Sequence, residues 1–170
     1  MSLFRTGSVA IFLAILSVAS AAAEPKPVNL PPVVHMKASL TVLGTDGKST
    51  VYSPADLEKL PTYQIETITP WRDEPAVFAG VLLTDLLQSH GLLSAQSIVV
   101  TAENDFSTTF DRRTISAAPI LIATRVNGVP HSRRTRGPIQ FVVEQEVYQS
   151  SALVTESHLV WMASHIEAAQ

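Results

Sequence analysis

The chain has 170 residues, no cysteine, 46% apolar residues and a formal net charge of −3. This length fits one domain with a sizeable hydrophobic core. The mild acidity argues against nucleic acid as a general partner, because phosphate binding needs a basic face. Without cysteine there are neither disulfides nor thiolate metal ligands, so the fold must rest on its core.

The first 23 residues have the pattern of a secretory signal peptide. Arg5 precedes an apolar stretch within Ser8–Val18, and small residues follow at Ser20–Ala23. The apolar run is shorter than the roughly 20 residues needed to cross a bilayer. We therefore expect cleavage after Ala23 and export to the periplasm, with residues 24–170 forming a single domain. An uncleaved N-terminal anchor is the alternative.

The next segments predict short strands and two helices. Four prolines in Glu24–Pro32 indicate an extended lead-in. A short helix begins at Ser53, with Pro54 in its first turn. Leucines recur on one face of a second helix at Val81–Gly91. Strands are expected at Val33–Leu43, Ser49–Tyr52 and Gln64–Thr69, with a turn at 45–48 that closes a hairpin and a loop at Pro70–Pro75.

The rest of the chain predicts further strands separated by polar loops. The loops span Glu103–Arg113 and His131–Pro138. The expected strands are Ser97–Ala102, Ile120–Val126, Ile139–Val143 and His158–Glu167. Many strands with only a few short helices predict a mixed α+β domain.

An ordered set of sequence pieces carries a resemblance to a known family. The pieces are Thr69-Pro70-Trp71, Phe78–Leu83 leading to Gly91, Val99–Ala102 followed by Asn104-Asp105-Phe106, Asn127–Pro130 followed by Gly137-Pro138, and a closing strand around Trp161. In this order and spacing they resemble the sulfite-oxidase-type molybdopterin-binding domain. The resemblance implies an α+β fold with a mixed, barrel-like β-sheet and a few short helices.

The missing cysteine separates this chain from the enzymes of that superfamily. In those enzymes a cysteine thiolate ligates molybdenum, and no other side chain replaces this soft ligand closely. The sequence therefore argues against the molybdenum cofactor and against an enzyme. A divergent molybdenum-cofactor-dependent oxidoreductase, or a subunit of one, is the alternative. A ligand-free interaction domain is a third possibility.

Small stand-alone periplasmic members of the fold, the PruR-like pterin-binding regulators, are similar in length and architecture. That resemblance implies a free, reduced pterin as the ligand. It also implies a partner: the periplasmic domain of an inner-membrane protein that makes or degrades cyclic-di-GMP.

Candidate ligand contacts lie in the irregular loops, because a pterin needs a flat apolar face to stack on and acceptors for its N–H groups. Trp71 either stacks on the ring or caps the core. Asp105 and Asp111 are candidate acceptors, or they cap turns, and Arg113 is a candidate contact that could instead pair with Asp111. Phe106 offers a second face, or belongs to the core.

Further candidates come from the basic loop and the strand that follows it. Arg136 stands with Arg133 and Arg134 and either holds a ligand tail or lies in solvent. Glu144 is a second candidate acceptor, and Tyr148 could stack or donate; both could instead be exposed. The five histidines are scattered, so we expect no metal site, and no catalytic motif is present.

Overall fold

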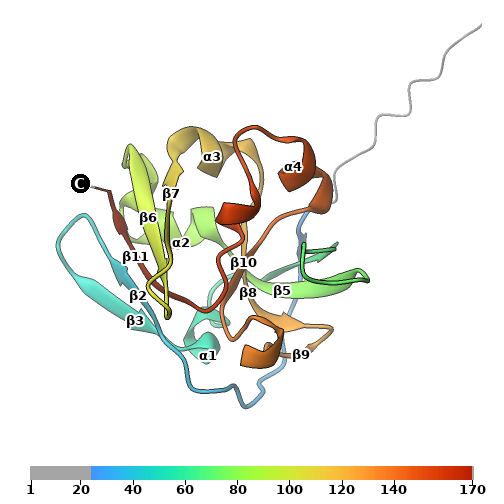
Figure 1. Cartoon of the computed structure of the whole chain (residues 1–170). Helices are drawn as coiled ribbons and strands as arrows, with labels where there is room; N and C mark the ends of the chain where they lie inside the picture. The colour runs from blue at the N-terminus through green and yellow to red at the C-terminus, as the bar shows by residue number, and fades with distance from the viewer. Residues whose placement is uncertain (1–23, 170) are drawn as a thin grey trace, which may run out of the picture.

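Two β-sheets and a few short helices make up residues 24–169, the part of the chain that this computed structural model describes. The expected signal peptide, residues 1–23, lies outside the described residues. Figure 1 shows the two sheets facing each other, with short helices around their edges.

The first sheet is antiparallel throughout. Its strands run in the order β1-β4-β5-β8-β10, and β9 pairs with β8 beside that path. The strands are β1 (Lys26–Pro27), β4 (Tyr63–Thr67), β5 (Ala76–Leu82), β8 (Leu121–Val126), β9 (Val129–Pro130) and β10 (Gln140–Val142). Every residue of β8 is buried, as expected for a strand covered on both faces.

The second sheet has the order β3-β2-β11-β6-β7, and within it β11 and β2 are parallel. The strands are β2 (Leu40–Leu43), β3 (Ser49–Tyr52), β6 (Ser97–Ala102), β7 (Ser107–Asp111) and β11 (Ala163–Ala168). Both sheets keep open edges within residues 24–169, so they form no closed barrel there.

The helices are short. They are α1 (Pro54–Leu57), α2 (Leu83–Ser89), α3 (Arg112–Ala117) and α4 (Gln145–Ser150), with 3-10 turns η1 (Leu92–Ser94), η2 (Arg133–Thr135) and η3 (Glu156–His158). At the start of α1, Ser53 and Asp56 form a reciprocal capping box. Of the helices in the described residues, none has the length and apolar character needed to cross a membrane.

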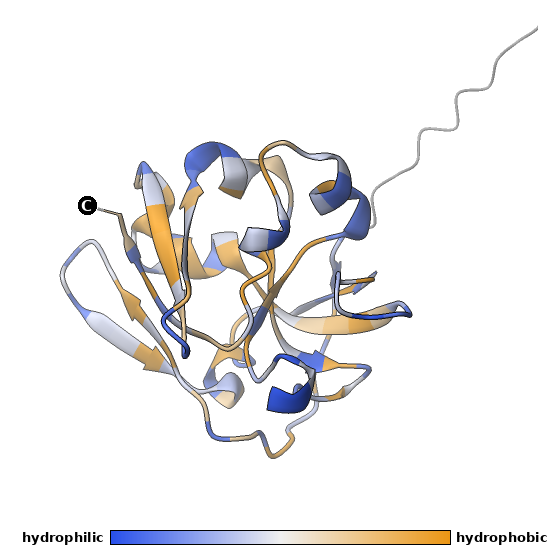
Figure 2. Cartoon of the chain, viewed as in Figure 1, coloured by the Kyte–Doolittle hydropathy of each residue, from blue (hydrophilic) through white to orange (hydrophobic). Residues whose placement is uncertain are grey.

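The hydrophobic core lies between the sheets. Strand β2 contributes Leu40 and Val42, β6 contributes Ile98 and Val100, and α2 contributes three fully buried leucines. Figure 2 shows the matching apolar stretches on β5 and β6, whereas η2 is hydrophilic. Burying each such side chain stabilises the fold by about 1.5–3 kcal/mol.

Gly80 lets β5 and β8 approach closely. A Cβ atom at Gly80 would lie 2.0 Å from the carbonyl oxygen of Ile122, so no other residue fits without moving the backbone. The register of the two strands shifts between Ala79 and Gly80, as at a β-bulge.

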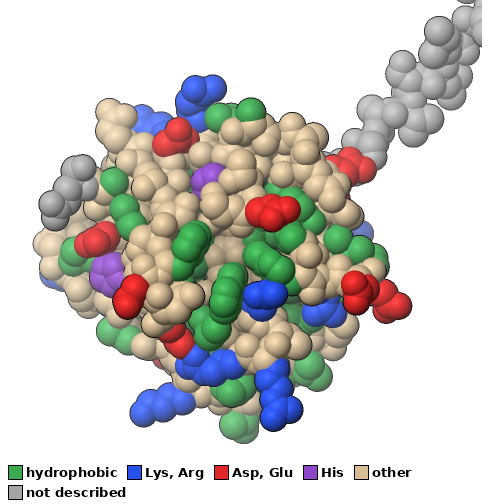
Figure 3. Space-filling view, viewed as in Figure 1, with side chains coloured by type: hydrophobic (Ala, Val, Ile, Leu, Met, Phe, Trp, Pro, Cys, Tyr) green, Lys and Arg blue, Asp and Glu red, His purple; other side chains and the backbone are tan. Residues whose placement is uncertain are grey.

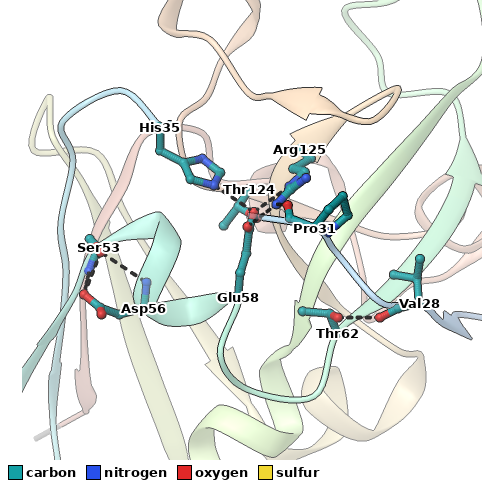
Figure 4. A network of polar contacts seen from close by, with 9 residues as sticks. All are labelled: Val28, Pro31, His35, Ser53, Asp56, Glu58, Thr62, Thr124 and Arg125. Atoms are coloured by element: carbon teal, nitrogen blue, oxygen red, sulfur yellow. Dashed lines mark hydrogen bonds and ion pairs between the residues drawn. The ribbon is translucent and has the colours of Figure 1, made fainter. Parts of the chain in front are cut away.

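A buried polar network fixes the proline-rich lead-in to the sheets (Figure 4). Arg125 of β8 donates to both carboxylate oxygens of Glu58, at 2.9 and 2.5 Å, and to the carbonyl oxygen of Pro31 at 2.6 Å. Thr124 donates to Glu58 at 2.6 Å, and His35 Nε2 lies 3.1 Å from the same carboxylate. These contacts hold the segment between β1 and β2 in place, where the chain forms no strand.

The structure confirms the expected α+β class and most of the expected strands. The β2–β3 hairpin, β4, β6, β8 and β10 all form close to their expected positions. The strand expected at Val33–Leu43 is shorter, because residues 33–39 are held by side-chain contacts rather than by a neighbouring strand. The last strand begins at Ala163 instead of His158, which lies in η3.

Several elements were not expected from the sequence. Strand β5 covers residues 76–80, for which no element was expected, and the first two residues of the expected helix, Val81 and Leu82; its continuous apolar run is largely buried. Strand β7 and helix α3 occupy much of the expected loop Glu103–Arg113 and the residues after it. Helix α4 follows β10 directly, beginning after Glu144.

Candidate functional site

Four loops meet at one end of the two sheets and enclose two adjoining hollows. The aromatic pocket, of about 300 Å³, is lined by Trp71, Asn104, Phe106, Glu156, Leu159 and Trp161 among others. The arginine pocket, of about 280 Å³, is lined by Thr69, Arg72, Arg133, Arg134, Arg136 and Gln140 among others. Trp71 and Trp161 line both pockets, so the two hollows share an indole wall.

The exposed surface around this region is both apolar and basic. Figure 3 shows hydrophobic side chains gathered near the middle of one face, with Lys and Arg side chains grouped directly below them. Contiguous exposed apolar patches often mark a binding site, whereas single exposed apolar residues are common. Trp71 is 36% exposed and Phe106 is 44% exposed.

Trp71 is held by a turn in the connection between β4 and β5. The backbone N–H of Arg72 donates to the carbonyl oxygen of Thr69 at 3.0 Å, and Thr69 itself is buried. The hydrogen bond and the burial of Thr69 therefore hold this turn in place, and the Trp71 indole lines both pockets.

Trp161 is fixed by backbone pairing on both sides. It forms an isolated β-bridge with Gln140. Beside it, the N–H of Phe141 donates to the carbonyl oxygen of Val160 at 2.7 Å, and the N–H of Met162 donates to the carbonyl oxygen of Arg136 at 3.3 Å. A rigid indole at this position can stack on a ligand without a large loss of side-chain entropy.

Arg136 lies against both indoles. Its guanidinium carbon is 4.4 Å from the ring centroid of Trp71 and 5.1 Å from that of Trp161. The backbone of Arg136 is left-handed, with φ of 78°, and ends η2. This conformation turns the side chain towards the tryptophans, and the cation–π contacts orient the two rings.

Gly137 brings the same loop close to His131. A Cβ atom on Gly137 would lie 2.5 Å from the Cγ atom of His131, so only glycine fits. His131 is buried, and its Nε2 lies 2.7 Å from Gln140 Oε1. Burial, together with the positive charge of Arg72, lowers the pKa of His131, although the hydrogen bond with Gln140 acts in the opposite direction. Because the pKa is lowered from 6.5, the imidazole is neutral at pH 7.

The hairpin between β6 and β7 carries Phe106. The N–H of Ala102 donates to the carbonyl of Phe106 at 2.8 Å, and the N–H of Glu103 donates to the carbonyl of Met162 at 2.9 Å. The second bond ties this hairpin to the segment that carries Trp161. The loops that carry Phe106 and Trp161 are therefore linked to each other by a backbone hydrogen bond.

Arg133 closes the outer side of the arginine pocket through a bidentate ion pair with Glu103. Its guanidinium also donates to the carbonyl oxygen of Lys37 at 3.2 Å. The Glu103 carboxylate raises the pKa of Arg133 above its ordinary value.

The structure brings three of the candidate residues together: Trp71, Phe106 and Arg136 all line the joined pockets. Asp105 lies in the same hairpin as Phe106 but is exposed, with φ of 65°, and stands outside the lining. Its left-handed backbone forms part of the turn between β6 and β7. Its role as a pterin acceptor remains a prediction.

The other candidates lie away from these pockets. Asp111 caps α3 by accepting from the N–H of Thr114 at 2.6 Å, which lowers the pKa of Asp111, and Arg113 is exposed on that helix. Tyr148 is buried and donates to the carbonyl of Ile68 at 2.9 Å. Glu144 lines a different hollow, beside β1, with one carboxylate oxygen buried and without a hydrogen-bond partner.

The sequence interpretation missed several pocket residues. Trp161 was treated as part of the last strand, although it is one of only two tryptophans in the chain. Asn104 and Glu156 reach the aromatic pocket from polar turns that give no distinctive pattern. Gln140 faces the arginine pocket from a strand whose apolar neighbours suggested only core.

The donor set around the pockets can be compared with what a molybdenum cofactor needs. The lining side chains supply indoles, guanidinium groups, amides, hydroxyls and one carboxylate, and the sequence holds no thiol. The metal half of that cofactor therefore does not fit these residues. Within residues 24–169, no group of three or more histidine or acidic side chains is arranged to hold a metal ion.

Comparison with known proteins identifies a shared fold. No protein-family model and no curated protein matches the sequence. Among solved structures, the chain is similar to the sulfane dehydrogenase SoxCD from Paracoccus pantotrophus, with a TM-score of 0.60 at 12% sequence identity. The match covers 94% of this chain but only 56% of the SoxCD chain. This likeness supports the expected α+β fold of the sulfite-oxidase type and, at such low identity, shows the fold alone.

Proposed function

We propose that this chain is a binding protein for a free, reduced pterin, which stacks in the aromatic pocket. The observation that carries the proposal is the meeting of Trp71, Phe106 and Trp161, from three separate loops, around one hollow. Its volume of about 300 Å³ lies at the lower end of the roughly 300–1,000 Å³ typical of small-molecule sites. A two-ring heterocycle matches both the size and the aromatic walls.

The polar groups of the pocket suit the edge of a pterin. Glu156 supplies a carboxylate, which accepts paired N–H groups such as those of the guanidine-like edge. Asn104 lies on the same wall, where its amide oxygen already accepts weakly from the N–H of Phe106 at 3.4 Å. Apolar walls with a few polar groups are the usual composition of a site that recognises a flat heterocycle.

The cellular part of the proposal rests on the sequence resemblance. We infer export through a cleaved signal peptide, and transfer of ligand state to the periplasmic domain of an inner-membrane cyclic-di-GMP enzyme. Sequencing the N-terminus of the protein recovered from the periplasm tests the first inference. Co-purification with such a partner domain, with and without pterin, tests the second.

The sequence resemblance to molybdopterin-binding domains, together with the fold shared with a sulfane dehydrogenase, favours a second candidate, a redox protein that holds the whole molybdenum cofactor. The lack of a thiolate weighs against it. Elemental analysis of purified protein separates the two functions: stoichiometric molybdenum would establish the second and overturn the first.

The direct test uses the fluorescence of the protein itself. Both tryptophans of the chain line the pocket, so a stacked pterin quenches nearly all of the intrinsic tryptophan emission. We expect saturable quenching by a reduced pterin, and Trp71→Leu should weaken binding about 5- to 150-fold, equivalent to about 1–3 kcal/mol. Met36→Ala, at an exposed apolar residue outside both pockets, is the control. Absence of saturable binding to the unaltered chain would refute the proposal.

A further inference from the structure

The arginine pocket carries positive charge that its own lining does not neutralise. Four arginines line it, and no aspartate or glutamate does. Arg133 is paired with Glu103. Within residues 24–169, no ion pair is formed by Arg72, Arg134 or Arg136. Such a concentration of like charge is unexpected in a chain whose formal net charge is −3.

Buried hydrogen-bond donors also point to a missing acceptor. Gln140 is 99% buried, its Oε1 is engaged by His131, and its Nε2 has no hydrogen-bond partner among the described residues. The Nε atom of Arg72 is likewise buried without a partner there. Leaving such a donor unpaired costs about 1–3 kcal/mol, so two on the wall of one pocket indicate a site built for an acceptor.

We propose that the arginine pocket binds an oxyanion carried on the tail of the ligand whose ring stacks in the aromatic pocket. The donors are planar guanidinium groups and an amide N–H, which match the acceptor oxygens of a phosphate monoester or a carboxylate. The shared wall of Trp71 and Trp161 places the ring site and the anion site side by side. The identification of the anion as a tail rests on the proposed pterin function.

The pocket has room for a phosphate or carboxylate group. Its volume is about 280 Å³, and its lining includes the buried Thr69 and Arg133, which is paired with Glu103. A guanidinium held against indole faces keeps its N–H groups available at the ring edge, so Arg136 can stack on the tryptophans and donate to the anion at once.

The test compares three ligands that share one reduced pterin ring: the neutral pterin, its phosphate monoester and a glutamylated form that bears carboxylates. Tryptophan quenching of the purified full chain at low salt gives each affinity. We expect at least one anionic form to bind about tenfold or more tightly than the neutral ring, as one charge-assisted hydrogen bond provides. Which form gains identifies phosphate or carboxylate as the anion.

The variants localise the effect. Arg134→Gln, at an exposed residue, should remove most of the anionic advantage and leave the affinity for the neutral ring unchanged. Lys48→Gln removes one positive charge from the distant β2–β3 turn and should change nothing. Equal affinity for all three ligands, or an advantage that survives Arg134→Gln, would overturn the anion site while leaving pterin binding in place.

A separate experiment distinguishes failure of the pterin proposal from failure of the anion site. If no pterin binds, titration with inorganic phosphate and with citrate still probes the arginine pocket alone. A shift in tryptophan emission that Arg134→Gln abolishes would support the anion site without the pterin. No response to either anion, in the absence of pterin binding, would overturn it.

Discussion

The guanidinium of Arg136 lies 4.4 Å from the centre of the Trp71 ring, and this pairing shapes the wall shared by the two pockets. Neither residue is held by a helix or strand. The contact joins the β4–β5 connection to the loop before β10, two segments that the backbone hydrogen bonds alone do not link directly. Arg136 is therefore a positioning residue for the indole wall as well as a source of charge.

Replacing Arg136 should loosen both tryptophans. In Arg136→Gln we expect the free energy of unfolding to fall by about 1–2 kcal/mol, the value of a partly desolvated cation–π contact. We also expect the tryptophan emission to move to longer wavelength and acrylamide to quench it more strongly. Urea unfolding and acrylamide titration measure the two effects. Unchanged quenching, with Lys48→Gln as the charge-matched control, would mean that Arg136 does not hold the indoles.

Breaking the buried Glu58–Arg125 ion pair should cost more free energy of unfolding than breaking an exposed one. Arg125 is 1% exposed, and its guanidinium bonds to the Glu58 carboxylate and to the Pro31 carbonyl. Arg125→Met leaves the carboxylate buried and short of partners, so we expect a loss of about 3–5 kcal/mol in urea unfolding. Lys59→Met breaks an exposed pair with Asp56 and should cost under about 1 kcal/mol. Equal losses would show that burial does not set the strength of the first pair.

The sequence predicted the strands better than the site. Hydrophobic periodicity indicates which face of a strand or helix is buried, but it does not indicate which loops meet. Strand β6 alternates buried and half-buried residues, and the β2–β3 hairpin carries a turn motif, so both were predicted. Strand β5 was not predicted, because the apolar run Ala76–Leu82 has no alternation, and its last two residues, Val81 and Leu82, were included in the expected helix Val81–Gly91. Its burial on both faces depends on neighbours that lie far away in the sequence.

The site was predicted in part: Phe106 was expected from its loop after a buried strand, and two other residues were conspicuous by themselves. Trp71 in a polar, proline-bounded loop and Arg136 in a basic loop each stood out. The place of Trp161 beside Arg136 depends on the β-bridge between Gln140 and Trp161, which no local pattern encodes. Asp111 was a candidate acceptor, yet its position before α3 makes it a helix cap, a role that the unrecognised helix concealed.

Acidification should destabilise the protein in two steps. Burial lowers the pKa of His131 from its ordinary value of 6.5, so below pH 6.5 the unfolded state binds more protons and stability falls. Burial opposes ionisation of Glu58, but hydrogen bonds from Arg125, Thr124 and His35 outweigh it and lower the pKa from 4.5. Stability contributed by Glu58 is therefore complete above pH 4.5 and is lost below it.

Unfolding free energies measured between pH 8 and pH 3 test both steps. We expect His131→Gln to flatten the upper step and Glu58→Gln to reduce the lower one, to which carboxyl groups such as Asp111, whose pKa is also lowered, contribute the remainder. A profile for His131→Gln that still falls between pH 6.5 and pH 5 as in the unaltered chain would contradict the assignment to this imidazole.

Replacing Gly137 should lower both the stability of the fold and the affinity for ligand. In Gly137→Ala the new Cβ atom would lie 2.5 Å from the imidazole of His131 and 2.6 Å from its carbonyl carbon, so the loop must shift. Overpacking of this kind costs about 1–3 kcal/mol. Because His131 orients Gln140 and the loop carries Arg136, we expect weaker ligand binding together with the lower stability.

Two further variants separate the possible causes. Gly47→Ala places a Cβ atom in open space at a left-handed turn, so it should cost about 1–2 kcal/mol of stability without affecting binding. His131→Ala combined with Gly137→Ala removes the ring but keeps the backbone carbon and oxygen that lie 2.6 and 2.7 Å from the new Cβ atom. The double variant should therefore stay impaired. Full recovery would show that the imidazole alone, rather than the close approach of the two backbone segments, demands glycine at this position.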